Sequence, residues 1–351
     1  MKNTEIVEIC PDNTQIERIE RASEALKKGG LVIFPTETVY GLGADSTNPQ
    51  AVERIYEVKR RPLNKPLALH IADRNEVERL VDAPPALFYT LSQAFWPGPL
   101  TLILKAKEGK VGFRFPDNKI AQALIKRAGV LSATSANLSG SPPPFSLADA
   151  IKELNGKVEL AIDGGKSRIG APSTVLDLSS FPVKVIREGV ISAERIRRLV
   201  RRKRVLFVCT GNTCRSVMAE GLLKKALKER KMEEIEVNSA GVFAFPETSP
   251  TKETIQVLRK EGIDVSDYRA KRLSSEMIKS ADLIFVMQDY HRDILLRYVP
   301  WAKKRIFVLD IPDPIGKPFN VYQEYFEKIK SHLPRILASI KELESSNREM
   351  D

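Results

Sequence analysis

The sequence predicts an α/β protein with two domains. The chain has 351 residues, whereas one hydrophobic core rarely organises more than ~250–300 residues. From residue 204 onward, short apolar runs alternate with helically spaced segments. This alternation is typical of a parallel sheet with helices on both faces. Hydrophobic residues make up 42% of the chain and charged residues 29%, the composition of a globular protein that folds in water.

The composition also argues against membrane insertion and a disulfide framework. No apolar run approaches the ~20 residues of a membrane span, and the N-terminus is too acidic for a signal peptide. The three cysteines are Cys10, Cys209 and Cys214, and two of them share one loop. Such sparse use favours a reducing cytoplasm, so we expect a cytoplasmic protein with no membrane partner. No cluster of His, Cys or carboxylates has metal-ligand spacing, so no protein-held metal is expected.

The net charge of +11 is concentrated in one segment. Residues 195–204 include seven basic side chains and no acidic one. A solvated helix end and linker explains this run, and a nucleic-acid-binding surface is the alternative. We therefore expect a first domain over residues 1–198, a basic linker over 199–203 and a second domain over 204–351.

The first half contains several polar segments between short strands. Helical spacing over residues 14–28 is followed by a buried strand at 31–34 and a polar loop at 35–43. Four cations lie within residues 59–65, where prolines make a rigid loop suited to phosphates. Strands are expected up to residue 71 and again after Thr101. Further polar segments lie at residues 112–117, 131–140, 163–165, 172–175 and 186–189.

These segments stand in the order of the motifs of the threonylcarbamoyl-AMP synthase family (Sua5/YrdC-type), which residues of about 12–198 resemble. The resemblance implies an α/β fold on a twisted mixed sheet with a large cationic concave face. The implied reaction joins L-threonine, bicarbonate and ATP, with Mg²⁺, into threonylcarbamoyl-AMP and pyrophosphate. A tRNA-modifying transferase would receive the product for the t6A modification of tRNA.

The resemblance also implies the site residues. A carbamate formed from threonine and bicarbonate would attack the α-phosphate, which needs mainly positioning and charge neutralisation. The family's Lys-x-Arg and Ser-x-Asn motifs fall within the residues implied for ATP: Lys59, Arg61, Thr134, Ser135, Asn137, Ser173 and Arg187. The residues implied for threonine are Thr36, Tyr40, His70 and Arg114, of which Arg114 could pair the carboxylate. His70 equally fits a structural histidine at a strand end.

The second half opens on a strand, a loop and a helix. The apolar run 205–208 predicts a buried strand, the loop holds Cys209 and Arg215, and residues 218–227 have helical spacing. This order aims backbone N–H groups and a helix dipole at one point, which favours an anion there. A cysteine and an arginine in that loop can attack and hold a phosphoryl group. Later strands are expected at residues 235–238, 282–287 and 305–309.

Residues of about 203–345 resemble the low-molecular-weight protein-tyrosine phosphatase family. The resemblance rests on the loop 209–216, on the segment 238–241 and on Asp313 followed by proline. It implies that Cys209 is the nucleophile, that Arg215 grips two phosphoryl oxygens, and that Asp313 acts as general acid and then base. It implies no cofactor for this half.

The other residues implied for this site support the loop. Ser216 would donate to the thiolate, and Asn212 and Ser239 would hold the shape of the loop. The remaining loop members are Thr210, Gly211, Thr213 and Cys214. Cys214 either forms a disulfide that protects Cys209 or packs as a plain thiol.

Two departures from the usual sequence of the tyrosine-directed phosphatases predict the substrate of the second half. Thr213 stands where tyrosine-directed members usually carry an aliphatic residue, and it resembles the protein-arginine phosphatase branch. Ile315 replaces the usual aromatic residue after Asp-Pro, which removes a wall for a phenol ring. We therefore expect a phosphoprotein substrate carrying phosphoarginine, with phosphotyrosine as the alternative. Asp310 is the alternative acid to Asp313.

Two other classes of function stay open on the sequence. The first half could be a tRNA- or RNA-binding module with a phosphotyrosine-specific or degenerate phosphatase domain. The second half could act only as a redox-sensing or docking domain.

Overall fold

The computed structural model describes residues 3–10 and 16–345. The chain divides into two compact units. Of the described residues, the first unit comprises those up to Pro84 together with Leu91–Ile196, and the second comprises Pro85–Thr90 together with those from Arg197 to Ser345. No helix in the described part of the chain is long and apolar enough to cross a membrane.

The expected basic linker over residues 199–203 consists mostly of regular structure. Helix α7 (Ala193–Arg201) includes residues 199–201, and strand β11 (Lys203–Cys209) begins at the last linker residue. Ile196 and Val200 are buried, so an apolar face holds this basic segment in a helix.

The first unit is built on a mixed sheet, as the sequence predicted. The described strands follow the order β1-β8-β2-β3-β7-β4-β6-β5-β9-β10. The pairs β1/β8, β2/β8, β4/β6 and β5/β9 are parallel, and the other neighbours are antiparallel. The strand bounds are β1 (Glu5–Glu8), β2 (Val32–Phe34), β3 (Gly41–Asp45), β4 (Ala68–His70), β5 (Leu100–Lys105), β6 (Lys110–Arg114), β7 (Leu131–Ser135), β8 (Leu160–Asp163), β9 (Thr174–Asp177) and β10 (Lys184–Arg187).

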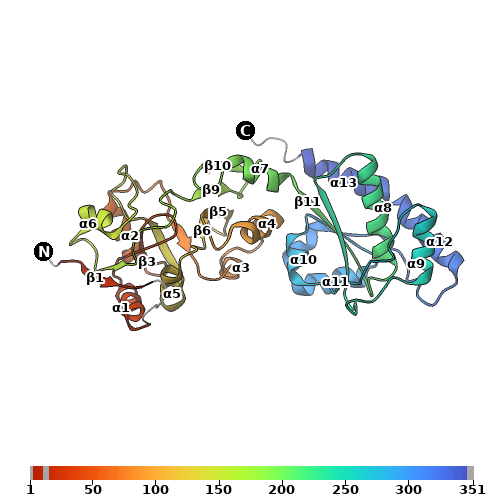
Figure 1. Ribbon diagram of the computed structural model, residues 1–351, viewed down its shortest axis with the longest axis horizontal. Helices are drawn as coiled ribbons and strands as arrows, with labels where there is room; N and C mark the ends of the chain where they lie inside the picture. The colour runs from red at the N-terminus through yellow and green to blue at the C-terminus, as the bar shows by residue number, and fades with distance from the viewer. Residues whose placement is uncertain (1–2, 11–15, 346–351) are drawn as a thin grey trace. The chain divides into compact units, whose positions relative to one another are not determined.

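Helices cover both faces of this sheet. Helices α1 (Ile16–Lys27) and α5 (Lys119–Ala128) lie side by side on one face, and their apolar sides meet strands β2 and β8 there (Figure 1). Residues 14 and 15, where the first helix was expected to start, lie outside the described residues. Helices α2 (Pro49–Lys59) and α6 (Leu147–Leu154) bury their apolar sides in a second core. Helices α3 (Glu76–Leu80) and α4 (Ala86–Phe95) lie between β4 and β5 along the chain.

The second unit has the parallel sheet that the alternating pattern predicted. Its strands follow the order β12-β11-β13-β14, and every pair is parallel. Strand β11 therefore has a neighbouring strand on each side, and the loop that follows it lies at the carboxyl ends of the strands. The other strand bounds are β12 (Ile235–Gly241), β13 (Leu283–Val286) and β14 (Ile306–Val308).

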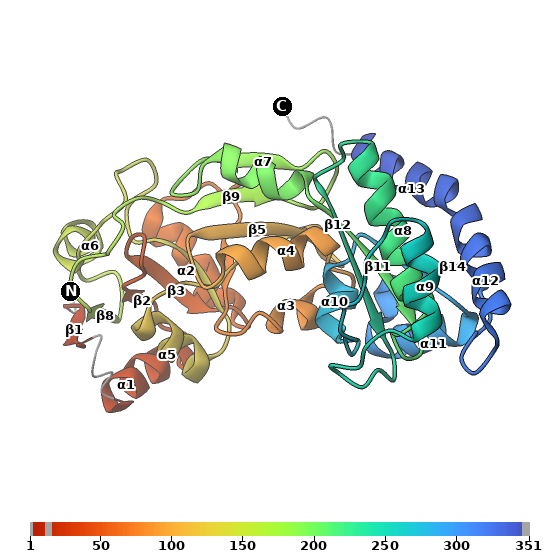
Figure 2. The same cartoon turned by 45° about the vertical axis from the view of Figure 1, so that its right-hand side comes forward.

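The side chains of β11 alternate between two cores, because successive residues of a strand point to opposite faces. Val205 and Phe207 pack on one side, whereas Leu206 and Val208 pack on the other. The first side carries α8 (Arg215–Glu229), α9 (Lys252–Lys260), α12 (Phe319–Ser331) and α13 (Leu333–Ser345). The second side carries α10 (Ser275–Ser280) and α11 (Asp289–Tyr298), which Figures 1 and 2 show. The 3₁₀ helix η1 (Pro300–Arg305) buries Ala302 in the same core.

Candidate active sites

Three arginines converge in the first unit. Arg61 follows the end of α2, Arg114 ends β6 and Arg187 ends β10. Burial, followed by the positive charges of Arg114 and Arg61, lowers the pKa of Arg187. Guanidinium groups that repel one another in this way form a site that an anion would stabilise.

The buried arginine of this cluster pairs with the polar loop that follows β2. Arg114 Nη2 donates to Glu37 Oε1 at 3.1 Å and also to the Thr38 hydroxyl. Arg114 Nε and Glu37 Oε2 are buried without a hydrogen-bond partner among the described residues. Because unpaired buried polar atoms cost free energy, they favour a ligand that brings an acceptor and a donor. Sequence reasoning identified the loop as polar but did not include Glu37 or Thr38 among the site residues.

The third arginine is oriented by the segment before β9. Arg187 donates from Nε and Nη2 to the Ser173 carbonyl, at 3.1 Å and 2.8 Å. Its Nη2 also reaches Ser173 Oγ at 3.2 Å, and that hydroxyl lies 3.0 Å from Thr101 Oγ1. Thr101 was recognised only as the start of a strand. The structure thus brings Ser173 and Arg187, each predicted to bind ATP, into direct contact.

The Lys-x-Arg motif divides into a buried and a half-buried cation. Lys59 is 1% exposed and donates to the carbonyl oxygens of Ser135 and Asn137. Burial, followed by the charge of Arg61, lowers the pKa of Lys59 to about 8. Arg60, at φ 51°, ends α2 and separates the two cations. In this structure Lys59 therefore holds the segment after β7.

Arg61 and Asn137 retain groups that a ligand could use. Arg61 is half-buried and donates to the carbonyls of Lys65 and Pro66, at 2.8 Å and 3.0 Å. Asn137 donates through Nδ2 to Leu138 and Ser141, whereas its buried Oδ1 has no partner among the described residues. Ser135 and Thr134 are half-buried at the end of β7.

Three of the residues predicted to bind threonine have contacts within the protein. Thr36 Oγ1 donates to the Val39 carbonyl at 2.6 Å and shapes the turn of the loop. The fully buried Tyr40 donates to the Gly165 carbonyl at 2.6 Å. His70 is buried edge-on to Phe34, and burial together with the charge of Arg114 lowers its pKa to about 3.

The second unit carries a loop wrapped around a thiol. Cys209 ends β11, and its Sγ lies 3.0 Å from Ser216 Oγ. The backbone N–H of Asn212 points at the same sulfur, at 3.2 Å. Asn212 has φ 55°, a left-handed conformation that asparagine tolerates, and this turns the loop chain inward. Helix α8 begins at Arg215, so its N-terminus faces the thiol.

Asn212 is the centre of the network that supports this loop. Its Nδ2 donates to Ser216 Oγ at 2.9 Å and to Ser239 Oγ at 2.8 Å. Its Oδ1 accepts from the Tyr268 hydroxyl at 2.9 Å and from a backbone N–H at 2.7 Å. Ser239 in turn donates to the buried Glu220 carboxylate at 2.6 Å. Tyr268 and Glu220 were not predicted, since neither lies in the motif segments.

The loop also packs tightly against the neighbouring strand at Gly241. A Cβ atom at this position would lie 2.6 Å from the Thr210 carbonyl oxygen and 2.8 Å from the Asn212 nitrogen. The absent side chain therefore leaves the space that the loop backbone occupies.

The loop arginine is almost fully buried, and four protein groups hold it. Arg215 is 1% exposed, and its Nη1 donates to Gln288 Oε1 at 2.8 Å and to the Ile311 carbonyl at 3.1 Å. Its Nη2 donates to Thr210 Oγ1 at 3.1 Å and to an Asp313 carboxylate oxygen. Its Nε has no partner among the described residues although it is buried.

The geometry separates the two candidate acids. The Asp313 carboxylate pairs with Arg215 and accepts from the Ile315 N–H at 3.2 Å. Asp310 contributes only its main-chain oxygen, which accepts from Lys328 at 2.6 Å. Asp313 therefore lies at the phosphate loop, whereas the described contacts of Asp310 lie at α12.

The second loop thiol is directed into the core. Cys214 Sγ lies 3.6 Å from Thr251 Oγ1 and 3.7 Å from the Tyr322 hydroxyl. It also lies 3.6 Å from Thr213 Oγ1, and Thr213 itself is half-buried. The cysteines are free thiols, so the predicted disulfide between Cys209 and Cys214 stays a prediction.

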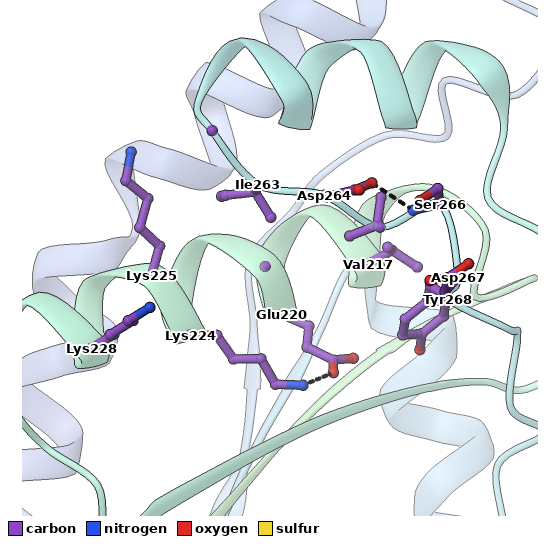
Figure 3. Close-up of a pocket in the computed structure, with 13 residues that line it drawn as sticks. Val217, Glu220, Lys224, Lys225, Lys228, Ile263, Asp264, Ser266, Asp267 and Tyr268 are labelled. Atoms are coloured by element: carbon purple, nitrogen blue, oxygen red, sulfur yellow. Dashed lines mark hydrogen bonds and ion pairs between the residues drawn. The ribbon is translucent and has the colours of Figure 1, made fainter.

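A pocket of about 670 Å³ lies next to α8, beside the hydrogen-bond network around Asn212. Figure 3 shows Lys224, Lys225 and Lys228 on one side of it and Asp264 and Tyr268 on the other. Glu220 lies in its wall and pairs with Lys224 at 2.5 Å. The pocket thus borders the residues that hold Asn212 without including the thiol.

The two sites define an α/β protein that carries a cluster of arginines in its first unit and a cysteine-containing loop at a helix N-terminus in its second. Residues 24–189 match the family model of Sua5, YciO and YrdC, described as telomere recombination. Residues 204–346 match the low molecular weight phosphotyrosine protein phosphatase family. The chain therefore belongs to the threonylcarbamoyl-AMP synthase (Sua5/YrdC) family, with a low-molecular-weight phosphatase domain fused behind the synthase-like domain.

Individual relatives agree with the first part of this assignment. The chain is 39% identical over 222 residues to the threonylcarbamoyl-AMP synthase of Pyrococcus abyssi, covering 59% of this chain and 65% of that protein. It is 37% identical over 194 residues to a putative threonylcarbamoyl-AMP synthase of Methanocaldococcus jannaschii, covering 52% of this chain and 92% of that protein. The chain thus spans less than two thirds of the Pyrococcus protein.

A solved structure of the same family is also similar to this chain. The crystal structure of P. abyssi Sua5 complexed with L-threonine matches with a TM-score of 0.54 and 26% identity. The match covers 94% of this chain and 98% of that one.

Proposed function

We propose that the first domain makes threonylcarbamoyl-AMP and pyrophosphate from L-threonine, bicarbonate and ATP. The convergence of Arg61, Arg114 and Arg187 carries the proposal, because this reaction transfers a nucleotidyl group between anions. The names of the relatives and the threonine complex of P. abyssi Sua5 support the substrate. The product would pass to a transferase that modifies tRNA.

The buried polar atoms that lack a hydrogen-bond partner among the described residues suit these substrates. The carboxylate of threonine would accept from Arg114 Nε, and Arg61 and Arg187 would neutralise the phosphates of ATP. The unpaired Asn137 Oδ1 would accept from a ribose hydroxyl. Orienting the carbamate toward the α-phosphate would then be the main contribution of the domain to the rate.

Mg²⁺ would enter this site with ATP and neutralise triphosphate charge. Among the described residues no group of three His, Cys, Asp or Glu side chains could hold the ion. The phosphates and water would therefore supply most of its ligands, as is common for Mg²⁺.

The test of the synthase function is pyrophosphate release by the full chain. Release should require threonine, bicarbonate and ATP together, and omission of any one should abolish it. Release that does not depend on threonine would contradict the assignment. Salt-sensitive tRNA binding without pyrophosphate release would support the RNA-binding alternative.

We propose that the second domain hydrolyses phosphoproteins through a phosphocysteine. The position of Cys209 Sγ at the N-terminus of α8, with Arg215 and Asp313 beside it, carries this proposal. The Cys209 thiolate would attack phosphorus while Asp313 gives a proton to the leaving group. A water molecule, deprotonated by Asp313, would then attack phosphorus and release the thiolate and phosphate.

The ion pair between Arg215 and Asp313 suggests how the acid is released. A phosphoryl group that binds Arg215 in bidentate fashion can use the unpaired Nε–H but also needs the Nη2–H that Asp313 accepts. Phosphoryl binding would therefore free the Asp313 carboxylate, which is 38% exposed, to face the leaving group.

Phosphoarginine is the proposed substrate of this domain, supported by Thr213 and by the absence of an aromatic residue at Ile315. Phosphotyrosine is the second candidate. The 41% exposed Tyr290, whose hydroxyl contacts Thr210, favours it because this ring could pack against a phenol. The deciding measurement is the ratio of kcat/KM for phosphoarginine and phosphotyrosine on the purified chain. A ratio below one would replace the first candidate by the second.

A further inference from the structure

The start of α11 braces the phosphate loop, and the mechanism above makes no use of this contact. Thr210 Oγ1 lies 3.2 Å from His291 Nε2 and accepts from Arg215 Nη2 at 3.1 Å. The arginine and the histidine therefore share one hydroxyl oxygen. Thr210 and His291 are 81 residues apart in the chain, and sequence reasoning did not name His291.

A backbone group fixes the tautomer of this histidine. His291 Nδ1 accepts from the Gln288 N–H at 3.1 Å, within the capping box at the N-terminus of α11. In a neutral imidazole the other nitrogen then carries the proton, so Nε2 donates to Thr210. Burial, followed by the charge of Arg215, lowers the pKa of His291 to about 4, which keeps the ring neutral near pH 7.

The hydroxyl of Thr210 is fully used. Its two lone pairs accept from His291 and Arg215, which leaves its proton for the Tyr290 hydroxyl. The rings of Tyr290 and His291 lie against each other, with centroids 3.9 Å apart. Thr210 therefore cannot rotate without breaking several contacts.

The same helix start holds the other side of the guanidinium. Gln288 Oε1 accepts from Arg215 Nη1 at 2.8 Å. The side chain of Gln288 thus holds Nη1 directly, whereas His291 holds Nη2 through Thr210. Together these contacts fix the plane of the guanidinium, so that the unpaired Nε–H and the Nη2–H now held by Asp313 can face a phosphoryl group.

We propose that His291 is a positioning residue of the phosphatase reaction, which acts through Thr210 to orient Arg215 toward the phosphoryl oxygens. The inference rests on the proposed phosphatase function. Misplacement of a reacting group by ~1 Å can cost ~100-fold in rate, so loss of this brace should be visible in kcat.

The test compares two substitutions of His291 in the full chain. His291→Asn keeps an acceptor for the Gln288 N–H, but its shorter side chain does not reach Thr210 as Nε2 does, whereas His291→Leu keeps neither contact. The readouts are kcat and KM for p-nitrophenyl phosphate, inhibition by vanadate, and the melting temperature. His332→Leu is the matched control, because this histidine lies at the end of α12.

We expect His291→Leu to lower kcat at least ~tenfold and to weaken vanadate inhibition in parallel, because Arg215 would bind both oxyanions less well. His291→Asn should lose kcat to a similar extent but keep the melting temperature of the wild type, and His332→Leu should match the wild type in both. Thr210→Val combined with His291→Leu should be no worse than Thr210→Val alone, since both remove one contact.

Two results would overturn this role. Wild-type kcat and vanadate inhibition in His291→Leu would show that the brace is not needed. A loss of kcat in His291→Leu alone, accompanied by a lower melting temperature, would assign His291 to helix capping alone. Phosphatase activity that survives in the Cys209→Ser variant would instead overturn the phosphatase mechanism. The failure of the His291 role and the failure of the proposed function are therefore distinguishable.

Discussion

Lys59 and Asn137, which lie 78 residues apart in the chain, are joined by a buried contact between an ammonium group and a main-chain oxygen. The contact fixes the segment after β7 to the end of α2. It gives Lys59 a task that differs from that of Arg61, although the two belong to one short motif.

Substitutions of the motif should therefore have different effects. Lys59→Met should destabilise the domain by about 1–3 kcal/mol, because it leaves buried carbonyls without a donor. Arg61→Ala should abolish pyrophosphate release with an unchanged melting temperature. Differential scanning calorimetry and a pyrophosphate assay separate the two effects. Normal turnover in Arg61→Ala would contradict the phosphate role.

The buried pair of Arg114 and Glu37 gives a prediction on stability. Glu37→Leu should cost about 3–5 kcal/mol, because it leaves the Arg114 guanidinium buried without its carboxylate. Glu37→Gln is the matched control and should cost less, since its amide oxygen still accepts from Arg114 Nη2. Urea unfolding measures both variants. Equal stability of the leucine variant and the wild type would show that the pair is not formed in solution.

The acid role of Asp313 can be tested with leaving groups. Asp313→Asn should lower kcat by about 10²–10⁴-fold for a substrate with a poor leaving group. The loss should be much smaller for an aryl phosphate with an acidic phenol, which leaves without protonation. Asp310→Asn is the control and should change neither rate. A larger loss in the Asp310 variant would move the assignment to that residue.

Thr213 is predicted to set the preference for the phosphorylated group. Thr213→Ile should lower the ratio of kcat/KM for phosphoarginine over phosphotyrosine, because an aliphatic side chain cannot donate or accept near a guanidinium. Thr213→Ser keeps the hydroxyl and should keep the ratio. A ratio unchanged in Thr213→Ile would remove the basis for the arginine assignment.

The stability of the phosphatase domain should depend on pH through His291. An unfolded histidine takes up a proton near pH ~6.5, whereas His291 in the fold does so near pH 4. Between these values the unfolded chain binds more protons, so stability falls as the pH is lowered. The free energy of unfolding of the wild type should fall by about 2 kcal/mol relative to that of His291→Asn from pH ~7 to ~5. Urea unfolding measures it, and a constant difference would mean that the folded histidine is protonated.

The sequence predicted the parts of these sites that are local in the chain. The loop from Cys209 to Ser216 follows directly from a strand, a turn and a helix start. The mixed and parallel sheets were also predicted correctly, and Asp313 was preferred over Asp310 on the proline that follows it. The signals for the loop and for Asp313 lie in neighbouring residues and the parallel sheet follows from the alternating pattern, whereas the mixed sheet was implied by the resemblance to the Sua5/YrdC-type family.

The contacts that tertiary packing creates were not predictable in this way. Glu37 reaches Arg114, Glu220 reaches Ser239, and His291 reaches Thr210 only because separate strands and helices pack together. Lys59 has contacts of the same kind, because its ammonium group reaches main-chain oxygens more than 70 residues away, whereas its predicted role toward ATP stays a prediction. The positions of these polar groups depend on the packed fold rather than on spacing in the chain.

The close approach of the phosphate loop to Gly241 predicts how mutations at this position would be tolerated. Even alanine would need the loop backbone to move, because the atoms in the way are a main-chain oxygen and a main-chain nitrogen. In a saturation library, position 241 should therefore accept no residue but glycine when phosphatase activity is selected. Selection for synthase activity alone should accept many residues at the same position. A single substitution of Gly241 should therefore remove phosphatase activity and leave synthase activity in place.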